Sequence, residues 1–199
     1  MDSRAWDERY ASAPELVWTA EPNRFVVEEV AGLSPGRAID LAAGEGRNAV
    51  WLAQQGWEVT AVDFSPVAIE RGRELARQRN VTVDWHVADV TTYTPPADGF
   101  DLVLIAYLHL PAAEIAVVLS HARDAVRAGG IVLVVGHDLA NLSGGTGGPQ
   151  DPDVLLTRES VAKELQGLRI RRAQTAHRPV TVQGRTVDAL DTVVVAERS

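Results

Sequence analysis

The chain has 199 residues, a formal net charge of −8 at pH 7 and no cysteine. The lack of cysteine excludes disulfides, thiolate metal sites and a cysteine nucleophile, and the negative charge argues against nucleic acid as a partner. The length suits a single domain, residues 1–199, and no apolar run approaches a membrane span. Because no signal peptide opens the chain, we expect a soluble cytoplasmic protein with a small-molecule substrate. Nothing in the sequence indicates an oligomeric state.

The first part of the chain, residues 1–32, is predicted to form a helical lid. Its first helix, Ser3–Ala11, places Trp6 and Tyr10 on one face at i, i+4 spacing. One interpretation is a helix packed on the edge of the sheet. The other is an aromatic lid over a cofactor, to which Trp18 would add, because aromatic ring faces attract cations.

After a second helix, Asn23–Ala31, the sequence shows the strand and turn of a nucleotide-cofactor site. Ala38–Leu41 is apolar enough for a buried strand, and Gly44 and Gly46 follow it. Glycines let the backbone turn tightly and let a ligand lie against bare amides at a helix N-terminus. The helix is predicted over Asn48–Gln55.

The next strand, Val59–Val62, ends at Asp63, where a carboxylate can accept hydrogen bonds from both hydroxyls of a ribose. A dinucleotide turn, G-x-G-x-x-G, requires a small third residue, and Ala49 meets that requirement. An NAD-linked oxidoreductase therefore stays open as an alternative. Asp40 and Glu45, however, would repel a diphosphate, whereas acids there suit a cation such as the ammonium and sulfonium of S-adenosylmethionine.

The third strand is predicted at Thr82–Val87, after a helix over Val67–Gln78 that Ser65 caps and Pro66 begins. In this strand Val83, Trp85 and Val87 alternate with Thr82, Asp84 and His86. Asp89 and Val90 follow the strand end.

The pattern D-x-x-x-G-x-G at Asp40, Gly44 and Gly46, with Asp63 beyond it, resembles motifs I and II of the class I S-adenosylmethionine-dependent methyltransferases. The resemblance implies that Asp89 meets the adenine amino group and that the Val90 amide meets the ring; a solvated loop acid is the other interpretation of Asp89. Together with the amino-terminal Trp-Asp-Glu-Arg-Tyr, the turn looks most like small tellurite-resistance and thiopurine-type methyltransferases. The predicted cofactor-binding residues are Asp40, Ala42, Gly44, Gly46, Arg47, Asn48, Asp63, Phe64, Asp89, Val90, Ala106, Tyr107, Trp6 and Tyr10.

The second half of the chain continues the alternation of strands and helices. Phe100–Ala106 is almost wholly apolar, as central parallel strands are. A helix over Pro111–Arg127 is expected to stop at Gly129-Gly130. A strand over Ile131–Val135 follows. The glycine-rich stretch Ser143–Pro149 falls where a flap over a substrate would fall.

Thr157 is predicted to cap a short helix through Leu165. Two strand-like runs, Leu168–Arg178 and Thr186–Glu197, then predict an antiparallel hairpin at one sheet edge. The fold class is α/β, a doubly wound Rossmann-like sheet with ligands at the strand carboxyl ends. The methyltransferase resemblance implies seven mostly parallel strands, with one antiparallel strand in the C-terminal hairpin.

The chemistry implied is in-line displacement of a methyl group from S-adenosylmethionine onto a small-molecule oxygen, sulfur, nitrogen or metalloid, which leaves S-adenosylhomocysteine. His109 and His137 are the candidate catalytic bases, since an imidazole titrates near neutral pH; a structural hydrogen-bonding role is the alternative for each. No metal site is predicted, because Asp138 lacks a partner acid after the fourth strand. A protein that binds S-adenosylmethionine without turnover would show the same cofactor motifs.

Overall fold

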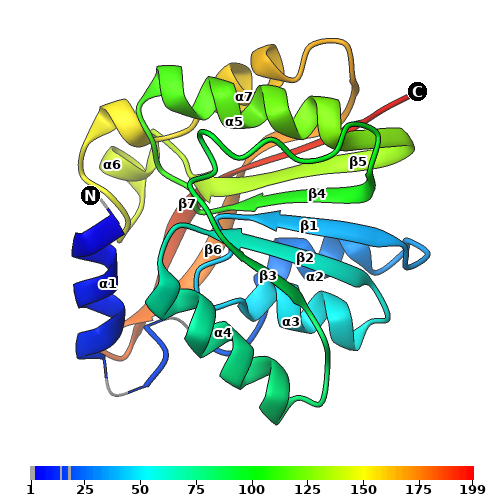
Figure 1. The fold of residues 1–199 in the computed structure, drawn as a ribbon. Helices are drawn as coiled ribbons and strands as arrows, with labels where there is room; N and C mark the ends of the chain where they lie inside the picture. The colour runs from blue at the N-terminus through cyan, green and yellow to red at the C-terminus, as the bar shows by residue number, and fades with distance from the viewer. Residues whose placement is uncertain (1–2, 14, 18) are drawn as a thin grey trace.

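The computed structural model describes residues 3–13, 15–17 and 19–199, so Trp18 lies outside the described residues. It forms a seven-stranded sheet in the order β3-β2-β1-β4-β5-β7-β6. Helices cover both faces of the sheet (Figure 1). The described part of the chain contains no helix long and apolar enough to cross a membrane.

The first half of the sheet is parallel and matches the predicted elements closely. Its elements in chain order are β1 Arg37–Leu41, α3 Arg47–Gln54, β2 Glu58–Asp63, α4 Pro66–Gln78 and β3 Asp84–Val87. The β1 strand pairs with β2, and β2 with β3, all in parallel. The carboxyl ends of the three strands therefore meet at one edge of the sheet.

The third strand begins at Asp84, two residues later than predicted. Its last residue, Val87, is 51% exposed. The reason is the position of β3 at the edge of the sheet, where its final residue lacks a neighbouring strand on one side.

The middle of the chain contains β4 Phe100–Ala106, α5 Ala112–Ala125 and β5 Val126–His137. The predicted end of α5 at Gly129-Gly130 is wrong, because the helix ends at Ala125 and β5 begins at once. A Cβ on Gly130 would lie 2.9 Å from the backbone oxygen of Asp101, so this glycine permits the close approach of β5 to β4.

The C-terminal part begins with short elements above the sheet edge and ends in the hairpin. These elements are α6 Asn141–Gly144, the 3-10 turn η1 Pro152–Val154, α7 Arg158–Glu164, β6 Arg169–Val182 and β7 Arg185–Glu197. The β7 strand lies between β5 and β6 and runs antiparallel to both. It is the one reversed strand of the sheet, as predicted.

Two apolar layers enclose the sheet. One face packs on α5 and α7, with residues such as Leu119 and Leu165, and the other packs on α3 and on α2 Arg24–Val30. The remaining helix, α1 Ser3–Ser12, contacts α4 near the carboxyl ends of the first strands. This arrangement places the amino-terminal helix beside the predicted site.

Candidate cofactor and acceptor site

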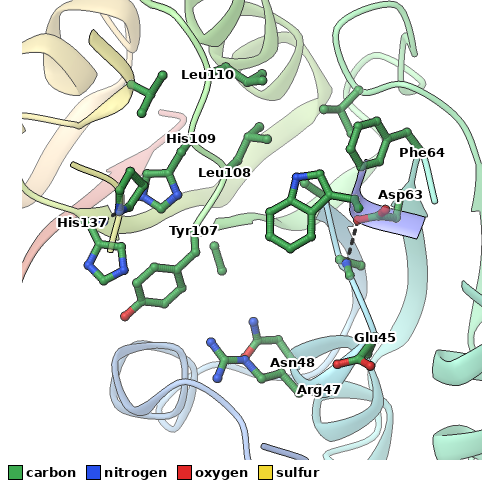
Figure 2. Close-up of a pocket in the computed structure, with 18 of the residues that line it drawn as sticks. Glu45, Arg47, Asn48, Asp63, Phe64, Tyr107, Leu108, His109, Leu110 and His137 are labelled. Atoms are coloured by element: carbon green, nitrogen blue, oxygen red, sulfur yellow. Dashed lines mark hydrogen bonds between the residues drawn. The ribbon is translucent and has the colours of Figure 1, made fainter. Parts of the chain in front are cut away.

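A cavity of about 1100 Å³ opens at the carboxyl ends of the strands. It brings together residues from all parts of the chain, including both candidate histidines (Figure 2). The predicted cofactor residues that line it are Ala42, Gly44, Arg47, Asn48, Asp63, Phe64, Asp89, Val90, Ala106, Tyr107, Trp6 and Tyr10.

Asp63 is held in place by two backbone amides. Gly44 N donates to its Oδ2 over 2.8 Å, and Ser65 N donates to its Oδ1 over 2.9 Å. Burial raises the pKa of Asp63, and the two amides oppose that shift. Each oxygen accepts one of these bonds, so the carboxylate is oriented and retains lone pairs for a ligand hydroxyl.

Asp89 is exposed and lines the same cavity. Its Oδ1 accepts from the amide and the hydroxyl of Thr91, over 2.9 and 2.7 Å. These bonds are those of a solvated loop acid, but they leave Oδ2 available. The adenine contact of Asp89 therefore stays a prediction.

Asp40 lies beneath the turn, and does not line the cavity. It is 1% exposed, and neither carboxylate oxygen has a hydrogen-bond partner among the described residues. Burial, and then the charge of Asp63, raises the pKa of Asp40 to about 7. A buried carboxyl without partners is costly unless charge is supplied nearby, so this residue fits a site for a cationic ligand.

Glu45 lines the cavity and is also paired within the protein. Its Oε1 accepts from Arg71 Nη1 over 3.0 Å and from Val17 N over 3.1 Å, and the side chain is 3% exposed. Arg71 also donates to the carbonyls of Ala13 and Glu15. The charge of Glu45 is thus balanced by Arg71, and the pair fastens the segment after α1 to the cofactor turn.

Gly46, like Asp40, does not line the cavity, contrary to prediction. A Cβ on Gly46 would overlap the ring of Trp85, and a Cβ on Gly72 would overlap the same ring from α4. Gly46, at φ +78°, therefore makes room for an indole between two helices. Gly44 is the glycine that faces the cavity.

The amino-terminal aromatics lie over that turn. Trp6 and Tyr10 stack with ring centroids 5.4 Å apart. The Tyr10 hydroxyl lies 3.1 Å from the position that a Cβ on Gly44 would take. Ser65 donates to Asp7, which adds a second attachment of α1. The predicted lid is thus in position, and its closure over a cofactor stays a prediction.

Arg47 and Asn48 stand at the start of α3. Asn48 Oδ1 accepts from Asn23 N over 2.8 Å and so fixes the beginning of α2. The guanidinium of Arg47 lies 5.7 Å from the Tyr107 ring centroid, and burial lowers its pKa. Among the described residues its side chain makes no hydrogen bond or ion pair, so this cation can receive an anionic group.

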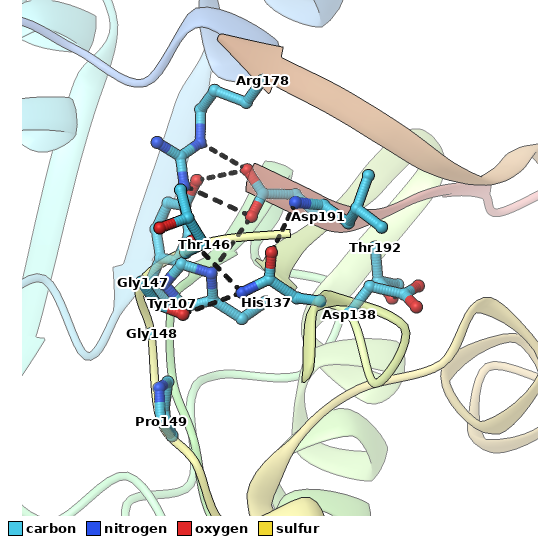
Figure 3. Close-up of polar contacts among 12 residues, drawn as sticks. Tyr107, His137, Asp138, Thr146, Gly147, Gly148, Pro149, Arg178, Asp191 and Thr192 are labelled. Atoms are coloured by element: carbon cyan, nitrogen blue, oxygen red, sulfur yellow. Dashed lines mark hydrogen bonds and ion pairs between the residues drawn. The ribbon is translucent and has the colours of Figure 1, made fainter. Parts of the chain in front are cut away.

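A network centred on Asp191 forms the other side of the cavity (Figure 3). Tyr107 Oη and Arg178 Nε donate to Asp191 Oδ2 over 2.7 and 2.6 Å. His137 Nδ1 lies 3.3 Å from Asp191 Oδ1. Burial alone would raise the pKa of Asp191, but the nearby His137 ring and the hydrogen bonds from Arg178 and Tyr107 hold it below its usual value.

Sequence reasoning missed Asp191 and Arg178. His137 and Asp191 are register partners on β5 and β7, and Arg178 reaches them from β6. One available signal was Asp191 itself, an acid within the otherwise mostly apolar run 189–196. A charged residue in a buried strand requires partners.

His109 is close to His137, but its geometry speaks against a role as the base. Its Nε2 accepts from His137 N over 3.2 Å, so the lone pair is already used. Burial, and then the neighbouring His137, lowers the pKa of His109 to about 4. His109 stacks on His137 with ring centroids 5.2 Å apart and positions it.

The glycine-rich stretch lies over His137, where a flap was predicted. A Cβ on Gly148 would lie 2.7 Å from the His137 ring, so the loop packs directly on the imidazole. Asn141 Nδ2 holds the loop by donating to the carbonyls of Thr146 and Gly147. Gly148 and Pro149 line the cavity.

Asp138 supports the fold at this edge. Its Oδ2 accepts from the hydroxyls of Thr175 and Thr192, over 2.9 and 2.6 Å, and its Oδ1 accepts from Ala140 N. Within the described ranges, no group of three or more histidine, cysteine, aspartate or glutamate residues is arranged to hold a metal ion.

Comparison with known proteins bears on this geometry. Residues 38–130 match the family model described as a methyltransferase domain. This segment, slightly under half of the chain, resembles the class I S-adenosylmethionine-dependent methyltransferases. It spans the cofactor turn, Asp63 and Asp89, and S-adenosylmethionine is the cofactor of the family.

The sequence relatives are distant. The methyltransferase domain of this chain is 22% identical over 112 residues to TehB of Haemophilus influenzae, named "Probable S-adenosyl-L-methionine-dependent methyltransferase"; the match covers 55% of this chain and 39% of TehB. It is 27% identical over 109 residues to hemagglutinin 1 of Eikenella corrodens, covering 54% of this chain and 36% of that protein. The matches thus span well under half the length of these relatives.

Solved structures agree with the fold. A protein described by the conversion of a disulfide bond into a thioacetal group during echinomycin biosynthesis aligns with a TM-score of 0.79 and 21% identity, over 99% of this chain and 93% of that one. TehB aligns with a TM-score of 0.73 and 15% identity, over 89% and 62%. The [4+2]-cyclase SpnF also aligns, with a TM-score of 0.70 and 14% identity, over 98% and 92%. The fold therefore carries more than one chemistry.

Proposed function

We propose that this protein transfers a methyl group from S-adenosylmethionine to a small-molecule acceptor. The observation that carries the proposal is the cavity edge formed by Gly44, Asp63 and Asp89 at successive strand ends. Oriented carboxylates suit ribose hydroxyls and an adenine amino group, and the bare turn suits a ligand that lies against it.

The residues present fit the cofactor at both of its ends. Asp63 would hold the ribose hydroxyls, while Asp89 and the Val90 amide would hold the adenine. Arg47 offers its guanidinium to the methionine carboxylate, and the carboxyl of Asp40 would favour the cationic part of the ligand. S-adenosylmethionine supplies a methyl group on a positively charged sulfur, which is a good leaving group.

For a displacement of this kind the protein must align the two reactants and exclude water. The cavity has the size for both, and two structural parts cover it: α1 with Trp6 and Tyr10, and the loop containing Gly148. The first lies over the cofactor turn and the second over His137. This separation favours a small acceptor bound beside His137.

Calorimetry tests the cofactor assignment. We expect S-adenosylmethionine and S-adenosylhomocysteine to bind and NAD not to bind. Binding of NAD with no response to the other two would replace the proposal by the alternative of an NAD-linked oxidoreductase.

A second experiment tests turnover. Release of S-adenosylhomocysteine is measured with a panel of phenols, thiols, amines, sulfides and metalloid oxyanions. Product from at least one acceptor is the expected result. Cofactor binding without product from any of them would favour a non-catalytic S-adenosylmethionine-binding protein.

A further inference from the structure

The geometry of the Asp191 network indicates how the acceptor is activated. This inference rests on the proposed function. We propose that the acceptor is a hydroxyl compound of phenol type, that His137 Nε2 removes its proton, and that Asp191 is the positioning residue that keeps His137 in the required tautomer.

The two ring nitrogens of His137 have different surroundings. Nδ1 is buried, lies 3.3 Å from Asp191 Oδ1 and makes no hydrogen bond to the described residues. The ring lines the cavity, and because Nδ1 lies next to Asp191, Nε2 is the nitrogen left for an acceptor. The separation is long for an N–H···O bond, as contacts between catalytic groups often are before a substrate binds.

Asp191 determines which nitrogen carries the proton. The side chain is fully buried, and Arg178 Nε and Tyr107 Oη donate to its Oδ2, while Arg178 Nη2 makes a longer contact of 3.5 Å with Oδ1. These donors favour the ionised carboxylate. A carboxylate next to Nδ1 attracts an N–H and repels a lone pair. The neutral imidazole therefore carries its proton on Nδ1, and the lone pair of Nε2 points into the cavity as a base.

A base in this position indicates the class of acceptor. Sulfides and tertiary amines have no proton to give, and a thiol is already partly ionised near neutral pH. A phenolic hydroxyl, with a pKa of about 10, is almost wholly protonated there and gains most from a base. The wall of the cavity contains Leu108, Leu110, Val154 and Pro149 as well as His137, and these apolar side chains suit an aromatic ring.

The transfer balances without any further reactant. The acceptor O–H bond breaks and its proton goes to His137 Nε2. A lone pair of that oxygen forms the bond to the methyl carbon, while the carbon–sulfur bond breaks and its electron pair stays on sulfur. The products are a methyl ether, S-adenosylhomocysteine and an imidazolium that returns its proton to solvent.

The substitution Asp191→Asn gives a specific prediction about the tautomer. Two donors, Tyr107 Oη and Arg178 Nε, converge on Oδ2, so the amide oxygen of asparagine takes that place. The amide NH₂ then faces His137 Nδ1 and requires it to accept. The proton moves to Nε2, and the base is lost although the side chain keeps its shape.

Nuclear magnetic resonance of ¹⁵N-histidine-labelled protein measures the tautomer of His137 directly and requires no acceptor. At a pH where His137 is neutral, we expect the Nδ1–H form in the wild type and the Nε2–H form in Asp191→Asn. The matched control is Asp188→Asn on the same strand, whose partner His177 is exposed and lies outside the cavity. An Nε2–H form of His137 in the wild type would overturn the proposal, whether or not the variant folds.

Methylation rates with two phenols of different acidity distinguish a role of His137 as the base from a purely structural role. For phenol itself, Asp191→Asn and His137→Ala should each lower kcat by about 100-fold or more, with little change in the Kd for S-adenosylhomocysteine. For 4-nitrophenol, which ionises readily without a base, the loss should be less than about tenfold. Equal losses on both phenols would contradict the proposed base.

Two further outcomes separate a failure of this inference from a failure of the proposed function on which it rests. Product with sulfides or amines but with no phenol would overturn the acceptor class and leave methyl transfer intact. Cofactor binding without product from any acceptor would contradict the proposed function itself.

Discussion

The two halves of the cavity are built differently. The cofactor half comes from β1, β2 and β3, where each functional residue lies next to a strand end within one local motif. The acceptor half is assembled by register, since His137 on β5 faces Asp191 on β7 and Arg178 arrives from β6. The first half orients a ligand mainly with backbone amides and single carboxylates, whereas the second relies on a buried network of charged side chains. We therefore expect substitutions in one half to spare the function of the other.

The largest effect is expected from Gly46→Ala in the cofactor half. The new Cβ would overlap the Trp85 ring, which Gly72 confines from its other side, and φ is +78°. Strain and overpacking together should cost about 3–5 kcal/mol of the free energy of unfolding, measured by urea denaturation. Gly129→Ala is the matched control, at φ +76° with open space around it, and should lose only about 1–2 kcal/mol. If Gly46→Ala and Gly129→Ala lose the same free energy of unfolding, the Trp85 ring is not the reason that a glycine is required at position 46.

Asp40 should make the stability of the ligand-free protein depend on pH. Its folded pKa of about 7 lies above the unfolded value of 3.8. The stability that it contributes is therefore fully present below pH 3.8 and is lost as the pH rises through 7. Each pKa unit corresponds to about 1.4 kcal/mol, so the wild type should lose about 4 kcal/mol relative to Asp40→Asn between pH 4 and pH 8. Unfolding curves of both proteins at several pH values test this, and a constant difference would contradict it.

In the acceptor half, His137→Ala should lower turnover by about 100-fold, because it removes the proton acceptor. The substrate is a phenol that the acceptor panel shows to be methylated. The measurement is kcat from S-adenosylhomocysteine release. His177→Ala, on the hairpin outside the cavity, is the control and should retain full turnover. Unchanged kcat in His137→Ala would return this histidine to a structural role.

The smallest effect is expected where the amino-terminal segment is attached. Glu45→Gln removes the charge that pairs with Arg71 and should weaken S-adenosylmethionine binding by roughly threefold, since the lid would be held less firmly. Glu74→Gln, which removes the partner of Arg77 on the exposed side of the same helix, is the control. If both variants bind equally well, the attachment has no influence on the cofactor.

The sequence predicted the cofactor half well because its signals are local. Glycines, a strand-end carboxylate and a small residue within one motif are sufficient to place Gly44 and Asp63. Gly46 does not line the cavity, and spacing alone does not reveal its neighbour Trp85. The pairing of Glu45 with Arg71 was not predicted for the same reason, because Arg71 lies far along the chain. Asp191 and Arg178 were missed for the same reason, since the contact with His137 exists only once β7 inserts between β5 and β6.

The central claim is that cofactor binding and acceptor activation are assigned to different halves of one cavity. Calorimetric titration of S-adenosylhomocysteine into Asp63→Ala and His137→Ala tests it most directly. Loss of a hydrogen-bonded carboxylate contact is worth about 1.5–3 kcal/mol, so we expect a Kd at least about tenfold weaker for Asp63→Ala and an almost unchanged Kd for His137→Ala. An unchanged Kd in folded Asp63→Ala, or equal weakening in both variants, would contradict the account.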